Sequence, residues 1–173
     1  VYEEIDLSEK FNHPLFFPKD GLYTSERKSL WRTIREAILD GRIHDIYNDA
    51  NPNFTELFDK ETYLKRLENR DGPEVVPLKS MDITSYKIKG IWYVDKRIGE
   101  MRYRLLGIMP RGKDMNNLAN DEPVDLFWLW YKDLRPVLHA QLVFDDRNNA
   151  SRVTFDQLLL SLIHISEPTR QVQ

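Results

Sequence analysis

Cationic side chains alternate along two neighbouring segments of the chain, and a tyrosine shares their spacing. Lys87, Lys89 and Tyr93 occupy odd positions of the first segment, and Arg102 and Arg104 occupy alternate positions of the second. If the segments are paired strands, the five side chains share one face and form a cationic surface. Such a surface attracts an acidic partner, so these five are the candidate partner-binding residues. An ordinary solvated sheet face fits the same spacing.

Motifs for catalysis and metal binding are absent from the sequence. The chain has no cysteine and no Gly-x-Ser-x-Gly elbow, and its seven glycines leave little material for a phosphate-binding loop. The histidines have none of the spacings of a metal-binding pair: His13, His44, His139 and His164. We therefore expect no catalytic, cofactor-binding or metal-binding residues.

Oxygen ligands crowd one predicted turn, the best local candidate for a calcium site: Asp145, Asp146, Asn148 and Asn149. The spacing differs from that of a helix-loop-helix calcium loop, so a solvated turn is the favoured interpretation. Because carboxylates are abundant, the alternative from another functional class is a hydrolase with paired carboxylates, one of them with a raised pKa in a deep pocket. A small acidic-ligand binding module, with a concave site on the cationic surface, is the third hypothesis.

The composition is typical of one soluble domain. The chain has 173 residues, of which 41% are hydrophobic and 31% charged. A net charge of −3 lacks the basic excess that favours nucleic acid, and no apolar run approaches the roughly 18 residues that span a bilayer. We expect neither a nucleic-acid partner nor membrane insertion. The lack of cysteine fits a cytoplasm and a periplasm equally.

A two-stranded hairpin must position the cationic residues. Apolar and polar residues alternate from 83 to 109 across a predicted turn at 97–99. A third strand is predicted at 126–131, which is apolar at both parities and so expected to be covered on both faces. A polar loop of residues 111–123 joins it to the hairpin.

Helices are predicted around this meander. Ser25 is the expected cap of a helix over residues 26–39, and Asp59 caps a second helix that ends before residues 71–73. Residues 73–77 are predicted to be a loop. The prediction is a single α+β domain, with an antiparallel meander centred on residues 83–131 and helices packed on it.

The ends of the chain give weaker patterns. Residues 1–24 are predicted to be an extended N-terminal arm, and an edge strand fits equally well. Residues 137–144, which follow Pro136, fit a helix and a strand equally. Thr154 with Gln157 forms a capping-box pattern that predicts the start of a last helix.

Five blocks of the chain, in order, resemble the GldN/PorN family of gliding-motility and type IX secretion proteins. Together they span nearly all of residues 1–159, which we assign to one GldN/PorN-like domain. The blocks are Ile5–Pro18, Arg27–Trp31 with Asp40–Ile43, Ile83–Lys89 with Trp92–Lys96, Arg104–Pro110, and Leu126–Trp128 with Leu134–Pro136.

The resemblance implies a periplasmic protein, peripheral to the outer membrane, of Bacteroidetes-type bacteria and without known catalytic activity. It implies self-association in a large ring with a GldK/PorK-like outer-membrane lipoprotein. The ring is expected to contact a GldM/PorM-like shaft anchored in the inner membrane.

Two segments depart from the family pattern. Gly90 and Ile91 stand where the family is expected to have acidic residues. Residues 160–173 replace an expected arginine- and aromatic-rich ending, and we expect this tail to be non-native. Because the chain starts at Val1 without a leader, we also expect its natural N-terminus to lie outside the sequence.

Overall fold

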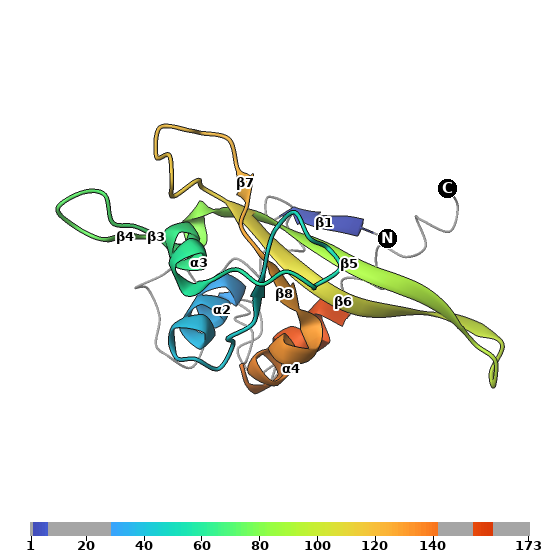
Figure 1. Cartoon of the computed structure of the whole chain (residues 1–173). Coiled ribbons are helices and arrows are strands. Elements are labelled where there is room, and N and C mark those ends of the chain that lie inside the picture. Colours follow the sequence, from blue (N-terminus) through green and yellow to red (C-terminus); the bar gives the residue numbers. More distant parts are fainter. Residues whose placement is uncertain (1, 7–28, 142–153, 161–173) are drawn as a thin grey trace.

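Two long strands form the centre of the sheet, as the alternation of residues 83–109 predicts. β5 (Ile83–Asp95) and β6 (Glu100–Gly112) pair antiparallel. The turn between them ends at Gly99, whose φ of 65° suits a residue without a side chain and whose amide donates to the Asp95 carbonyl at 2.8 Å. The computed structural model describes residues 2–6, 29–141 and 154–160 (Figure 1).

The other strands pair antiparallel around this hairpin in the order β1-β5-β6-β8-β2, and β7 also pairs with β6. They are β1 (Tyr2–Asp6), β2 (Ile46–Tyr47), β7 (Val124–Asp125) and β8 (Trp128–Trp130). β1 is therefore an edge strand, and the rest of the predicted N-terminal arm lies outside the described residues. The predicted third strand is confirmed as β8, although it is shorter than 126–131.

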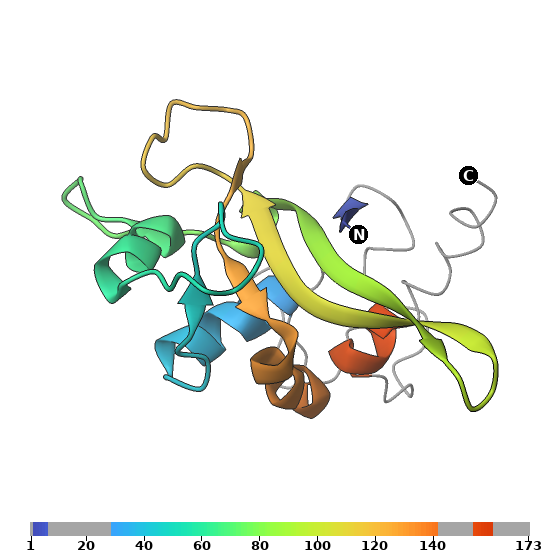
Figure 2. The same ribbon diagram turned by 45° about the vertical axis from the view of Figure 1, so that its right-hand side comes forward.

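Helices cover one face of the sheet (Figure 2). α2 (Leu30–Leu39), α4 (Tyr131–Ala140) and the helical residues 155–160 supply much of the core on this side. Their buried apolar side chains meet those of alternate sheet residues: Ile34, Leu134, Leu138, Phe155 and Leu159 with Tyr86, Ile88, Ile108 and Leu129. The predicted α+β class, an antiparallel meander with packed helices, is confirmed.

α2 begins later than the sequence predicts. Ser29 has extended backbone, and its hydroxyl accepts a hydrogen bond from the Arg32 amide at 3.2 Å, so Ser29 is the cap. The predicted cap, Ser25, lies outside the described residues. The Ser29 hydroxyl is buried and also lies 2.6 Å from that of Ser80, which joins the start of α2 to the segment before β5.

We expect Ser29→Ala to lower the free energy of unfolding by about 1–2 kcal/mol, because it removes the cap and leaves the buried Ser80 hydroxyl without this partner. Chemical denaturation measures the change. In a double-mutant cycle with Ser80→Ala, the two losses should be less than additive. Full additivity would show that the two hydroxyls do not act together.

α3 (Lys60–Leu67) starts at the predicted cap. The Asp59 carboxylate accepts from the Thr62 amide at 2.8 Å. The helix ends at Leu67 because the chain then forms β3 (Glu68–Asn69), which pairs with β4 (Val76–Pro77). The predicted loop of residues 73–77 is therefore wrong at residues 76 and 77, which form β4.

α4 begins inside the third predicted strand and runs through Pro136. The helix starts at Tyr131 and includes the proline, because Leu134, Val137 and Leu138 have helical spacing and are all buried. The open choice for residues 137–144 is settled as helix up to Ala140, whereas residues 142–144 lie outside the described part.

The last described helix begins as the capping box predicts. The Thr154 amide donates to Gln157 Oε1 at 3.1 Å, and the Gln157 amide donates to Thr154 Oγ1 at 3.5 Å. Asp156 follows the cap and is buried, and its carboxylate accepts a hydrogen bond from the Tyr131 hydroxyl. This bond ties the last helix to α4.

Burial raises the pKa of the Asp156 carboxyl above its ordinary 3.8. The folded state then holds the proton on Asp156 more tightly than the unfolded state, so protonation of this carboxyl stabilises the fold. This contribution to the free energy of unfolding is fully present below pH 3.8 and is lost as pH rises through the pKa of the folded state. We expect the wild type to lose stability relative to Asp156→Asn across this range. Denaturation of both proteins at several pH values measures the difference, and a pH-independent difference would contradict the expectation. Arg135 and His139 face the same carboxylate, at 3.7 and 3.9 Å.

Candidate functional site

The outer half of the β5–β6 hairpin projects beyond the rest of the sheet (Figures 1 and 2). Among the described residues, β1 pairs with β5 only as far as Lys89, and β8 pairs with β6 only at Gly107 and Ile108. We call residues 90–105 the distal hairpin. Its two strands continue to pair with each other as far as Asp95 and Glu100.

Aromatic packing braces the distal hairpin where it leaves the sheet. A Cβ atom at Gly90 would lie 2.0 Å from the Tyr103 hydroxyl oxygen, so the tyrosine ring occupies the space beside this glycine. The same ring packs edge-on against Trp92, with centroids 5.3 Å apart. Gly90 thus makes room for a cross-strand aromatic contact.

The strand register places all five predicted partner-binding residues on the face opposite the helices. Tyr93 pairs with Arg102, and Arg104 pairs with Ile91, a neighbour of Tyr93 on the same face. The predicted face is therefore correct. The residues nevertheless form two groups, because Lys87 and Lys89 lie beside the body and the other three lie on the distal hairpin.

Lys87 and Lys89 contact the body of the protein itself. The Lys89 ammonium donates to the Pro52 carbonyl and lies 5.6 Å from the centroid of the Phe54 ring. Lys87 Nζ lies 3.9 Å from Asp125 Oδ2, and Asp125 also accepts a 2.6 Å hydrogen bond from Arg111. These contacts attach the loop before α3 and strand β7 to the hairpin.

The two cations of the distal hairpin, Arg102 and Arg104, are exposed to solvent, and Tyr93 lies beside them on the same face. The Arg104 guanidinium lies 5.1 Å from the centroid of the Tyr93 ring, a distance suited to a cation–π contact. Arg102 is exposed, with its Nε 4.0 Å from Asp95 Oδ2. Of the predicted site, this trio is therefore best placed to meet a partner.

Sequence reasoning expected Ile91 on the exposed cationic face but missed the other exposed apolar side chains of the distal hairpin. Val94 and Met101 are cross-strand partners with exposed fractions of 59% and 61%, and Ile91 and Ile98 are exposed as well. The alternation of Val94 and Met101 matches that of the core residues nearer the centre of the sheet, whereas Ile91 lies on the opposite face. Val94 and Met101 stay exposed because the hairpin extends past the helices. Exposed apolar side chains beside ordered cations are typical of a protein-binding surface.

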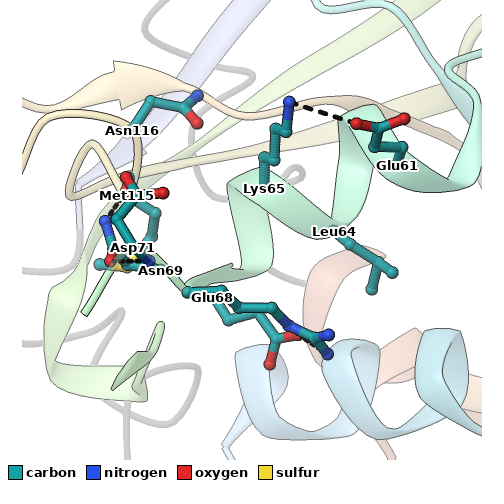
Figure 3. Close-up of a pocket in the computed structure, with 9 residues that line it drawn as sticks. Glu61, Leu64, Lys65, Glu68, Asn69, Asp71, Met115 and Asn116 are labelled. Carbon is teal, nitrogen blue, oxygen red and sulfur yellow. Dashed lines mark hydrogen bonds and ion pairs between the residues drawn. The ribbon is translucent and has the colours of Figure 1, made fainter. Parts of the chain in front are cut away.

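A pocket of about 340 Å³ lies at the other end of the molecule, between α3, β3 and the loop after β6 (Figure 3). It holds the carboxylates of Glu61, Glu68 and Asp71, but Lys65 pairs with Glu61 at 3.5 Å. Asp156, the carboxyl whose pKa burial raises, does not line this pocket. The two features expected of a paired-carboxylate hydrolase therefore lie in different places.

Metal-binding geometry is not found in the described part of the chain. No three His, Asp or Glu residues there are grouped to hold an ion, and His44 and His139 are exposed. His13, His164 and the predicted oxygen-rich turn at 145–149 lie outside the described residues. Within the same described ranges, no helix has the length and apolar character needed to cross a membrane.

Comparison with known proteins gives one family. The family model described as "Gliding motility associated protein GldN" matches residues 1–163. The match includes the candidate partner-binding residues and both strands of the hairpin. A search of curated proteins finds no match.

Proposed function

We propose, because this chain belongs to the GldN family of gliding motility associated proteins, that it is a non-enzymatic assembly subunit of the gliding and type IX protein secretion machinery. In this proposal it lies in the periplasm, peripheral to the outer membrane. It self-associates in a ring with a GldK/PorK-like outer-membrane lipoprotein, and the ring contacts a GldM/PorM-like shaft protein.

The observation that carries the proposal is the distal hairpin. It exposes apolar side chains at the end of a braced projection, and Arg104 and Tyr93 present a cation already held against an aromatic ring. An ordered projection loses little conformational freedom on binding, which favours assembly. Nothing in the fold requires these side chains to be apolar, because they do not contribute to the buried core.

The family also supports the non-enzymatic part of the proposal, since it is a family of motility proteins and not a known enzyme family. No observation on the described residues favours a hydrolase over an assembly subunit. We propose residues 1–159 as the assembling domain, with the tail from residue 160 as non-native. Truncation after residue 159 should therefore leave assembly unchanged.

The first experiment is size-exclusion chromatography of the purified chain with the cognate GldK/PorK-like lipoprotein. We expect a high-mass complex, and we expect Arg102→Glu with Arg104→Glu to reduce its yield by at least about tenfold, since a like-charge contact costs several kcal/mol. The control reverses two exposed cations on the body, Arg42→Glu with Lys65→Glu, and should leave the yield unchanged. Equal yields of the complex from both double variants would show that the distal hairpin makes no contact in the assembly.

A further inference from the structure

We infer that the distal hairpin docks into an acidic hollow at the opposite end of a second copy of this chain. The inference rests on the proposed function as an assembly subunit and names the contact through which the copies associate. The inference follows from the opposite charges of the distal hairpin and the hollow, from the exposed apolar side chains of both, and from their positions at opposite ends of the sheet.

The distal hairpin supplies the positive partner. Its residues include four cations and two acids, a net charge of +2 in a chain whose net charge is −3: Lys96, Arg97, Arg102 and Arg104 against Asp95 and Glu100. Ile98 stands exposed in the turn, next to the exposed pair Val94 and Met101. The hairpin thus ends in an apolar tip flanked by cations.

The hollow supplies the negative partner. It has a volume of about 520 Å³ and lies between the loop joining β3 to β4 and the loop after β6. Val76 and Leu118, both exposed, line it together with Asp71 and Glu74, and Val75 beside it is 52% exposed. The hollow therefore combines apolar and acidic side chains, as the hairpin tip combines apolar and cationic ones.

Acidic charge predominates around the hollow. Residues 68–77 and 113–123 contain six acids and two cations, a net charge of −4: Glu68, Asp71, Glu74, Asp114, Asp121 and Glu122 against Arg70 and Lys113. Within the described parts of the chain, the carboxylates of Asp71, Glu74, Asp121 and Glu122 make no ion pair. They remain available to cations from outside the chain.

Position excludes docking within one molecule. The loops around the hollow and the tip of the hairpin lie at opposite ends of the sheet in both views (Figures 1 and 2). A contact between them must join two copies, and the pair then has one free hollow, on the first copy, and one free hairpin, on the second, for further neighbours. Such a head-to-tail contact builds a ring when the rotation closes, or an open chain when it does not.

Cysteine cross-linking tests this contact directly, because the chain contains no natural cysteine. We expect the full-length variant with Val76→Cys and Ile98→Cys to give dimers, trimers and higher multimers on mild oxidation. The matched control combines Ile98→Cys with Leu39→Cys, an exposed position at the end of α2. It should give no multimers beyond random collision, and an equal ladder from both variants would overturn the inference.

Charge exchange makes the test specific. In the Val76→Cys, Ile98→Cys background, Arg102→Glu with Arg104→Glu should reduce the multimers at least about tenfold, as should Glu74→Lys with Glu122→Lys. Mixing the two reversed proteins should restore a ladder in which they alternate, because the two new glutamates of one hairpin then face the two new lysines at the neighbour's hollow, and the unchanged hairpin faces an unchanged hollow. A mixture that gives as few cross-linked multimers as either reversed protein alone would contradict the inference.

The outcomes separate this contact from the proposed function. If the chain forms a complex with the lipoprotein but gives no specific ladder, the hollow is not the docking site and the proposed function stands. If the ladder forms and charge exchange restores it, but the lipoprotein is not bound, the self-contact stands and the proposed assembly fails.

Discussion

The Gly107→Ala variant is expected to lose about 3 kcal/mol of stability and to melt roughly 6–12 °C below the wild type, the upper end of the cost of overpacking. A Cβ atom at residue 107 would lie 2.2 Å from Cζ of Phe54 and 3.1 Å from the Leu129 carbonyl oxygen. The carbonyl belongs to β8 and is fixed by its strand. The phenyl ring would have to move.

The Phe54 ring has little freedom to move. It packs edge-on against three other rings, at centroid distances of 5.4 Å to Tyr47, 5.9 Å to Trp128 and 4.8 Å to Trp130. Its backbone φ of 56° is uncommon for a bulky residue, and this strain persists only where the surroundings hold the residue in place. This aromatic cluster covers the sheet face opposite the helices.

Gly72→Ala is the matched control for Gly107→Ala. A Cβ atom at residue 72 meets nothing within 4 Å, so this variant should melt at or slightly above the wild-type temperature. In the Phe54→Ala background, Gly107→Ala should cost much less, because the clashing ring is gone. Equal losses from Gly107→Ala in both backgrounds would show that Phe54 does not determine the cost.

Shortening the distal hairpin is expected to abolish assembly while leaving the fold intact. The variant replaces residues 93–102 by Asn-Gly, a two-residue turn that joins the cross-strand partners Trp92 and Tyr103. The deleted segment contains no buried residue, so the melting temperature should change by less than about 2 °C, the shift for under 1 kcal/mol. The high-mass complex and the cross-linked ladder should both disappear.

The control for the shortened hairpin keeps its length and removes only its apolar tip. Val94→Ser, Ile98→Ser and Met101→Ser should weaken assembly without changing the melting temperature, because all three side chains are exposed. Full assembly by the shortened protein would mean that the distal hairpin makes no assembly contact. A large fall in its melting temperature would mean that the hairpin supports the core.

Local patterns were sufficient to predict the central hairpin, β8 and the caps of α3 and of the last helix, although they missed Ser29 as the cap of α2. Alternation gave the hairpin and the face that carries Lys87 to Arg104, because parity along a strand depends only on backbone geometry. Apolar residues at both parities of 126–131 correctly predicted a strand covered on both faces. In β8, Leu129 lies in the core, and Trp128 and Trp130 pack against Phe54 on the opposite face.

Features that depend on tertiary contact escaped prediction. The local pattern after Pro136 fitted a helix and a strand equally, and packing of Leu134, Val137 and Leu138 keeps α4 helical through the proline. Lys87 and Lys89 have the same local pattern as Arg102 and Arg104. Only the positions of β7 and of the loop before α3 show that these lysines contact the body. The exposure of Val94 and Met101 depends on where the helices end, which their own alternation does not encode.

The most direct test of the assembly function is affinity isolation from the envelope of cells that carry the gliding machinery, with tagged full-length chain and tagged shortened-hairpin variant in parallel. We predict that the full-length chain is isolated in a high-mass complex with the GldK/PorK-like lipoprotein and untagged copies of itself. The shortened variant should be present in equal amount but isolated alone. Isolation of the full-length chain as a monomer, or identical complexes from both proteins, would contradict the account.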